Sequence, residues 1–185
     1  MTRTASDRII ESAQEETQTV DPQTDARPLP DDFFKKMVHV PDAALDSLKS
    51  QIVAVTADQV RKAHELGLLK HMQLLMEDTK FLTTTDAAFE AVLPYVGTNQ
   101  MRYVASRWVC RTYANLFTVV CAGLLDIDAV GRTLDFAGHH SYNAVWLMQD
   151  GVLTEFAIEP QTDQLIRTLD SARHYTGEGL VTCGA

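Results

Sequence analysis

Two short apolar runs joined by a turn constrain the fold of this chain more than any other feature. The segment from Ser141 to Met148 is rich in β-branched and aromatic residues, and a second such run extends from Val152 to Glu159. Asp150 and Gly151, which lie between the two runs, are a strong signal for a two-residue hairpin turn. The sequence therefore predicts an antiparallel β-hairpin.

This hairpin places His140 and Glu159 on one face. In an antiparallel pair, residues that lie directly opposite, or diagonal by two, share a face. With a two-residue turn, Tyr142 lies opposite Glu159 and His140 is its diagonal neighbour. With a four-residue loop over 148–151, His140 itself lies opposite Glu159. In either register a carboxylate can hold the imidazole and support its positive form, unless a bulge shifts the register by one residue.

Upstream of the hairpin, apolar residues recur with helical spacing. Between Ala43 and about Leu69 they predict two helices, the second capped by Thr56. A short helix opens at Thr85, and we expect Pro94 and Gly97 to end it.

A longer helix is predicted around Cys110. Its apolar face consists of Val109, Tyr113, Phe117, Val120 and Leu124. Cys110 would stand in the first turn, where the partial positive charge of the helix end favours a thiolate, and Arg107 and Arg111 flank it. Cys121, three turns further on, is expected in the core. The three cysteines form no CxxC pair, which argues against a zinc ribbon and a disulfide framework.

Charge and hydropathy limit the partners of the chain. The net charge is -9 and the basic residues are scattered, so we expect no nucleic-acid partner. The longest apolar run, from Phe117 to Leu125, is too short to cross a membrane, and the N-terminus lacks the apolar segment of a secretory signal. We therefore expect a cytoplasmic protein, or a virion-associated one if a phage encodes it.

The composition divides the chain into three regions. Residues 1–32 hold eight acidic and three basic residues, a net charge of -5, and predict a disordered acidic tail that can order on a protein partner. Residues 33–97 are predicted to be a helical region, and 98–185 a core that includes the hairpin. Residues 33–185 are expected to fold as one unit. Residues 164–169 predict a strand or short helix, and the end from Gly177 onward is loosely determined.

A metal site is a weaker alternative at the same hairpin. His139, His140 and Glu159 are all ligand types, but neighbouring residues on a strand point to opposite faces. Both histidines would reach one ion only if His139 lay in the loop. We therefore expect neither a metal nor another cofactor.

The residues around the cysteine and the hairpin resemble the papain-like cysteine peptidase superfamily. The matching series is Cys110 at a helix start, the His140-Ser141-Tyr142-Asn143 strand opening, and the Glu159-Pro160-Gln161 strand end. Over about residues 95–167 the series is most similar to the C-terminal domain of a fungal agglutinin and to uncharacterised bacterial and phage proteins. The resemblance implies an α+β, papain-like fold, with N-terminal helices and a Cys-bearing central helix packed on a short antiparallel sheet.

The resemblance also implies a catalytic triad. Cys110 would attack a carbonyl, His140 would transfer the proton and Glu159 would orient His140, which together make a thiol-dependent hydrolase of a peptide or amide bond. The upstream glutamine typical of such enzymes is replaced by Val104, which leaves Gln100 as the oxyanion candidate. The alternative is a catalytically inactive papain-like module that serves as a structural or adaptor protein.

Overall fold

The computed structural model describes residues 39–98, 110–168 and 178–184 of the 185-residue chain. Its helices are α3 (Asp42–Lys49), α4 (Ala57–Leu66), α5 (Asp86–Val96) and α6 (Cys110–Leu124). Its strands are β1 (Val53–Thr56), β2 (Gln73–Met76), β3 (Lys80–Thr83), β4 (Val130–Asp135), β5 (His140–Gln149), β6 (Val152–Glu159), β7 (Gln164–Ile166) and β8 (Gly179–Cys183).

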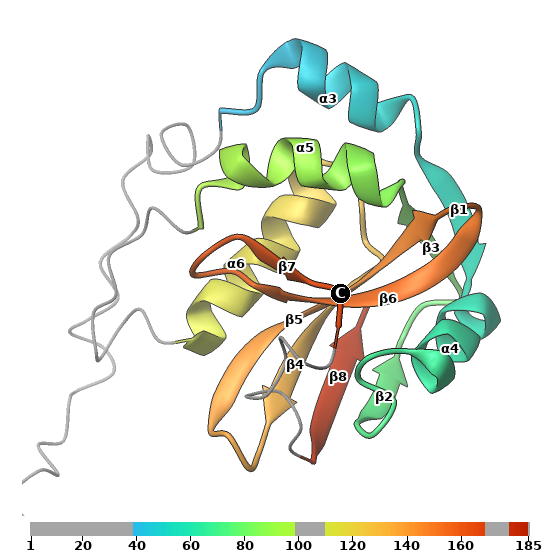
Figure 1. Cartoon of the computed structure of the whole chain (residues 1–185), viewed down its shortest axis with the longest axis vertical. Coiled ribbons are helices and arrows are strands. Elements are labelled where there is room, and N and C mark those ends of the chain that lie inside the picture. Colours follow the sequence, from blue (N-terminus) through green and yellow to red (C-terminus); the bar gives the residue numbers. More distant parts are fainter. Residues whose placement is uncertain (1–38, 99–109, 169–177, 185) are drawn as a thin grey trace, which may run out of the picture. The chain divides into compact units, whose positions relative to one another are not determined.

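A six-stranded mixed sheet forms the centre of the fold, with the strand order β2-β8-β4-β5-β6-β7 (Figure 1). All neighbours in this order pair antiparallel except β2 and β8, which are parallel. A second, two-stranded antiparallel sheet joins β1 to β3. The strands that carry His140 and Glu159 are therefore neighbours inside the larger sheet.

Each face of the larger sheet is covered by its own apolar core. Helices α3, α5 and α6 contribute to the first core, which includes Leu48, Phe89, Val92, Phe117, Val145 and Phe156. Helix α4 and the segment after it contribute to the second, which includes Val60, Leu69, Met72, Tyr142, Trp146 and Val181. Because both faces are covered, seven consecutive residues of β5 are buried and its sequence reads as a nearly continuous apolar run.

The predicted hairpin is confirmed, with its two-residue turn. Gln149 pairs with Val152, and Asp150 and Gly151 have φ angles of 50° and 79°. Two positive φ angles at these positions are those of the turn that matches the right-handed twist of the strands. The turn therefore fixes the register of the β5–β6 ladder, which runs from Gln149 and Val152 to Asn143 and Ile158.

The region before the hairpin is less helical than its spacing predicts. Helix α3 ends at Lys49, and β1 follows where a continued helix is expected. Strands β2 and β3 also lie within residues 33–97. Four-residue strands carry too few residues to show a two-residue period, so their pairing partners decide their structure. Thr56 does cap α4 as predicted: its Oγ1 accepts from the Gln59 N–H, and the Gln59 Oε1 accepts from the Thr56 N–H.

Helix α5 and the segment after Gly177 differ from the expectation. Helix α5 continues through Pro94, which costs a backbone hydrogen bond only in the last turn, and is capped by Gly97 with φ 75°. The segment after Gly177 forms β8, which lies between β2 and β4 rather than being loosely determined. The predicted strand or short helix near Gln164 is the strand β7.

The fold class is α+β, as predicted, but the expected short antiparallel sheet is wrong. The larger sheet has six strands and contains a parallel pair, because β8 returns to pair with β2 on one side and β4 on the other. Cys110 lies on α6, which packs on β4 and β5.

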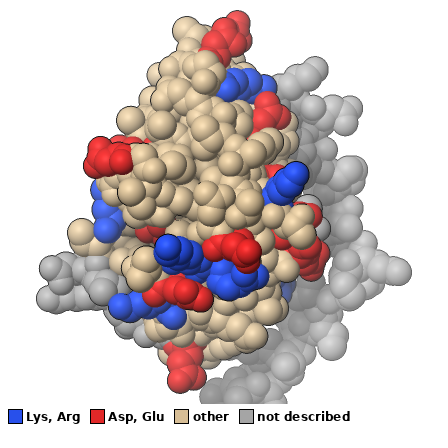
Figure 2. All heavy atoms as spheres, turned by 90° about the vertical axis from the view of Figure 1, so that its right-hand side faces the viewer, with Lys and Arg blue, Asp and Glu red and all other residues tan. Residues whose placement is uncertain are grey.

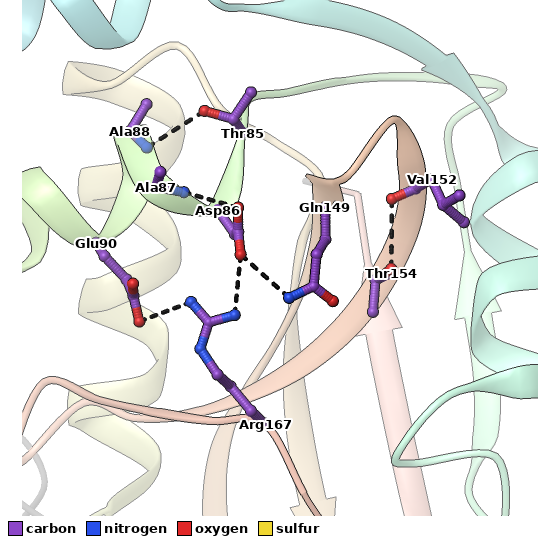
Figure 3. A network of polar contacts seen from close by, with 9 residues as sticks. All are labelled: Thr85, Asp86, Ala87, Ala88, Glu90, Gln149, Val152, Thr154 and Arg167. Carbon is purple, nitrogen blue, oxygen red and sulfur yellow. Dashed lines mark hydrogen bonds and ion pairs between the residues drawn. The ribbon is translucent and has the colours of Figure 1, made fainter.

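Arg167 ties the end of β7 to the start of α5 (Figure 3). Its guanidinium contacts Asp86 at 2.9 Å and Glu90 at 2.8 Å, and lies 5.1 Å from the centre of the Phe156 ring. Gln149 donates to the same Asp86 oxygen at 3.3 Å. The hydrogen bond from Arg167 is the main reason why the pKa of Asp86 is lowered. These contacts fix the edge strand β7, which pairs with the strand that carries Glu159, to α5.

Charges of both signs are mixed on the face drawn in Figure 2. Lys and Arg lie beside Asp and Glu in its lower half, and most of this face consists of other residues. In the part of the chain that the structure describes, no helix is both long and apolar enough to cross a membrane.

Candidate functional site

A pocket of about 450 Å³ lies where the start of α6 meets the turn between β4 and β5. Its lining residues are Cys110, Arg111, Leu134, Asp135, Phe136, His139, His140 and Ser141. The structure thus brings Cys110 and His140 together from positions 30 residues apart in the sequence. Glu159 reaches the same imidazole from the neighbouring strand β6.

His140 and Glu159 form a partly buried pair. The His140 Nε2 lies 2.6 Å from the Glu159 Oε2, and the two side chains are 25% and 12% exposed. The Glu159 Oε1 accepts from the Gln161 N–H at 3.2 Å. The ring of Tyr142 stacks on the imidazole, with centroids 5.8 Å apart. The carboxylate and the tyrosine ring therefore hold the imidazole in one orientation, as the register argument predicts for His140 and Glu159.

The surroundings of His140 favour its protonated form. The hydrogen bond that the imidazole donates to Glu159 is the main reason why the pKa of His140 is raised; burial opposes it, while the charge of Glu159 and a hydrogen bond with Cys110 add to it. Because Nε2 faces Glu159, Nδ1 is the nitrogen left to face the thiol. An imidazole between a thiol and a carboxylate can accept the thiol proton and keep it.

Asn143 fixes the helix that carries Cys110 against the strand that carries His140. Its amide nitrogen donates to the Ala114 carbonyl at 3.0 Å, the Thr118 hydroxyl at 3.0 Å and the Gly131 carbonyl at 3.2 Å. The side chain is fully buried. Sequence reasoning placed Asn143 in the strand motif but gave it no role. A buried amide within an apolar strand was the available signal, because such groups are nearly always hydrogen-bonded.

The turn between β4 and β5 supplies pocket residues that sequence reasoning missed. Asp135, 3% exposed, pairs with His140 across the ladder, and its Oδ1 accepts from the Gly138 N–H at 2.7 Å. Phe136 is 61% exposed at the rim. His139 lies in the turn with φ 49°, as a metal site would require. Within residues 39–98, 110–168 and 178–184, however, no three His, Cys, Asp or Glu side chains are grouped to hold a metal ion.

The other two cysteines differ from Cys110 in their surroundings. Cys110 is partly exposed, whereas Cys121 and Cys183 are buried, the former as the sequence predicts. Burial raises the pKa of the Cys121 thiol strongly, and raises that of Cys183 to about 12. Both thiols are therefore protonated and inaccessible at neutral pH, which makes them internal controls for Cys110.

Several residues singled out in the sequence lie outside the described residues. They are the oxyanion candidate Gln100, the neighbouring Val104, Arg107 and Val109, and the acidic tail over 1–32. The predictions made for them stay predictions.

Comparison with known proteins finds a likeness in structure alone. No family model and no curated protein matches the chain. A solved structure described as a PSL1a-E64 complex matches with a TM-score of 0.53 and 16% identity, over 70% of this chain and 50% of the other. A structure of the Polyporus squamosus lectin bound to the epitope Neu5Aca2-6Galb1-4GlcNAc matches with a TM-score of 0.49 and 16% identity, over 69% and 49%. The chain spans about half the length of these structures.

These matches correct the family drawn from the sequence. The first match, PSL1a, is a lectin and is not described as a peptidase, so the expected membership in the papain-like cysteine peptidase superfamily is wrong. The predicted thiol-dependent hydrolase and its alternative, an inactive papain-like module, both depended on that membership and are withdrawn with it. A motif of three short segments fits many folds by chance, which is why it misled. At 16% identity, the first match establishes a shared fold only.

Proposed function

We propose that the pocket at the start of α6 is a reactive-thiol site, in which Cys110 is the nucleophile, His140 accepts its proton and Glu159 orients the imidazole. The observation that carries this proposal is the position of His140, whose ring contacts Glu159 at 2.6 Å and is hydrogen-bonded to Cys110. The reaction we assign to the thiol is attack on an electrophilic carbon. Hydrolysis of a peptide or amide bond is no part of it.

Each residue has a separate task in this reaction. His140 takes the proton from the Cys110 sulfur, and Glu159 stabilises the resulting imidazolium. The sulfur then forms a bond to the electrophilic carbon. With iodoacetamide as the electrophile, the carbon–iodine bond breaks and iodide leaves, so that charge and atoms balance.

Selective alkylation tests the site. We expect iodoacetamide to modify Cys110 at least about 100-fold faster than Cys121 and Cys183 at pH 7, because the latter two are buried and protonated. Peptide mapping by mass spectrometry at several reaction times gives all three rates in one sample. The variant Cys110→Ser should lose the fast reaction and keep the two slow ones. Equally slow modification of all three cysteines would contradict the proposal.

A second candidate function for the same pocket is carbohydrate binding, favoured by Phe136. Phe136 is 61% exposed and lines this pocket together with Asp135 and Arg111. An exposed aromatic face next to charged hydrogen-bonding groups suits the apolar face and the hydroxyls of a sugar. The name of the lectin among the matching structures points to the same class of ligand.

The same labelling experiment separates the two functions. The trisaccharide Neu5Aca2-6Galb1-4GlcNAc and E64, the compounds in the two matching structures, are added separately before iodoacetamide. Protection of Cys110 by the trisaccharide, lost in Phe136→Ala, would support carbohydrate binding in this pocket. Fast alkylation that the trisaccharide leaves unchanged at millimolar concentration would leave the reactive thiol as the function and exclude this sugar as the ligand.

A further inference from the structure

A second histidine–glutamate pair lies inside the fold, away from the pocket of Cys110. His64 on α4 is 5% exposed, and its Nδ1 lies 2.5 Å from the Oε1 of Glu155 on β6. Its Nε2 lies 2.9 Å from the Met72 carbonyl. The other Glu155 oxygen accepts from the Leu69 N–H at 2.7 Å. One carboxylate and one imidazole thus hold α4, the segment 67–72 and β6 together.

The contacts of His64 determine how many protons the pair carries. Met72 offers a carbonyl, which can only accept, so Nε2 must carry a hydrogen. Glu155 offers a carboxylate, so the short contact with Nδ1 needs one more proton, shared between the two groups. The pair therefore carries one proton more than a neutral imidazole beside an ionised carboxylate. Loss of that proton would leave an uncompensated negative charge in a buried place.

The groups around His64 leave Glu155 as its one buried charged partner among the described residues. On α4 itself, Arg61, Lys62 and Glu65 are exposed, and on the segment after the helix, Lys70 and His71 are exposed. Strands β1 and β2, which also contact α4, carry no titratable side chain. The ring of Trp146 on β5 meets the imidazole edge-on, with centroids 6.4 Å apart. Among residues 39–98, 110–168 and 178–184, no buried cation is therefore close enough to His64 to replace the proton.

Gly67, the first residue of the segment 67–72, lies very close to Glu155. A Cβ added to Gly67 would overlap the Oε2 and the Cβ of Glu155 and the Ala63 carbonyl. The absence of a side chain at this position lets the chain turn against the carboxylate. A cavity of about 440 Å³ is lined in part by Ala63, Gly67 and Glu155. Glu155, the carboxylate of the histidine–glutamate pair, thus forms part of the wall of that cavity.

We propose that His64 and Glu155 form a protonation-dependent latch, which holds residues 67–72 against β6 at neutral pH and releases them as the pH rises. Release would break the hydrogen bond of the Leu69 N–H and open the wall of the adjacent cavity. This latch acts on residues that the Cys110 site does not use.

The direction of the pH effect follows from the contacts of His64. Burial, the largest influence, acts to lower the pKa of His64, but the hydrogen bond and charge of Glu155 and the Met72 carbonyl outweigh it, so the pKa is raised. A histidine with a raised pKa in the folded state adds stability below its unfolded pKa of about 6.5, and this stability is lost as the pH rises through the folded value. The latch is therefore closed in acid and opens on the alkaline side.

Two measurements on the unaltered chain test the latch. In a ¹⁵N spectrum of the histidine side chains, we expect His64 to carry a hydrogen on both nitrogens at pH 7. In hydrogen exchange from pH 6 to pH 9, corrected for the intrinsic pH dependence, we expect protection of the Leu69 amide to fall at least about tenfold relative to the Trp146 amide. The Trp146 amide, on β5 of the central sheet, donates to the Ala129 carbonyl and is the reference for global unfolding.

Variants connect these results to the pair. His64→Gln should abolish the pH-dependent loss of Leu69 protection, while the matched His71→Gln, a change at an exposed histidine seven residues from His64 on the chain, should preserve it. A neutral His64 at pH 7, or Leu69 protection that falls only in step with that of Trp146, would overturn the proposal. Both decisive readings come from the unaltered chain, so they hold even if His64→Gln fails to fold.

Discussion

Replacing His140 with alanine is expected to slow alkylation of Cys110 by about tenfold at pH 6. An ordinary thiol, with a pKa of about 8.5, is only about 0.3% thiolate at this pH. In the proposed site His140 accepts the proton of the Cys110 thiol, and His140→Ala removes that acceptor. A thiol that keeps its proton more firmly is a stronger nucleophile once ionised, and this offsets part of the loss. We therefore expect a net loss of about tenfold.

The neighbouring histidine supplies the matched control. His139 lines the same pocket but is exposed in the turn between β4 and β5, and its removal should change the rate less than twofold. The alkylation rate of Cys110 in Glu159→Gln should lie between the rates in the two histidine variants. The amide can still orient the ring, but it no longer stabilises the positive charge of the ring. Equal rates in His140→Ala and the unaltered chain would exclude His140 as the base.

Replacing Asn143 with leucine is expected to lower the free energy of unfolding by about 2–4 kcal/mol. The substitution keeps the branched shape of the side chain but removes a donor that serves three acceptors, and leaves the Gly131 carbonyl without that partner in a buried place. Urea unfolding followed by fluorescence measures the loss. Thr118→Ala, which removes one of the three acceptors, should cost only about 1 kcal/mol.

Asn143→Leu has a second effect that ordinary loss of stability would not produce. Because Asn143 ties α6 to β4 and β5, the Cys110 sulfur should lose its fixed position relative to His140. Alkylation of Cys110 should therefore slow under conditions in which the variant remains folded. If Asn143→Leu lowered the free energy of unfolding by less than about 1 kcal/mol and left the alkylation rate of Cys110 unchanged, Asn143 would not position α6.

Local signals predicted the part of the fold that carries the site. The Asp150-Gly151 turn fixed the hairpin, and the hairpin fixed the contact between His140 and Glu159. Strands β1, β2, β3 and β8 escaped prediction because each has four or five residues and is held by partners distant in the sequence, such as β8 between β2 and β4. Their burial depends on that pairing, which residue spacing does not reveal.

Residues that support the site were harder to find than the titrating residues. Asn143 and Asp135 act through hydrogen bonds to backbone groups that come together only in the folded chain. His64 and Glu155 are separated by 91 positions and lie in segments without a functional motif, so no spacing argument joins them. The family inferred from the motif was wrong because three short segments specify local chemistry far better than they specify ancestry.

The pH dependence of Cys110 alkylation in the unaltered chain tests the central claim most directly. If His140 holds the thiol proton beside Glu159, the rate constant at pH 6 should remain within about threefold of its value at pH 8. A rate constant that falls by about two orders of magnitude over the same range, as for an isolated cysteine, would contradict the reactive-thiol site.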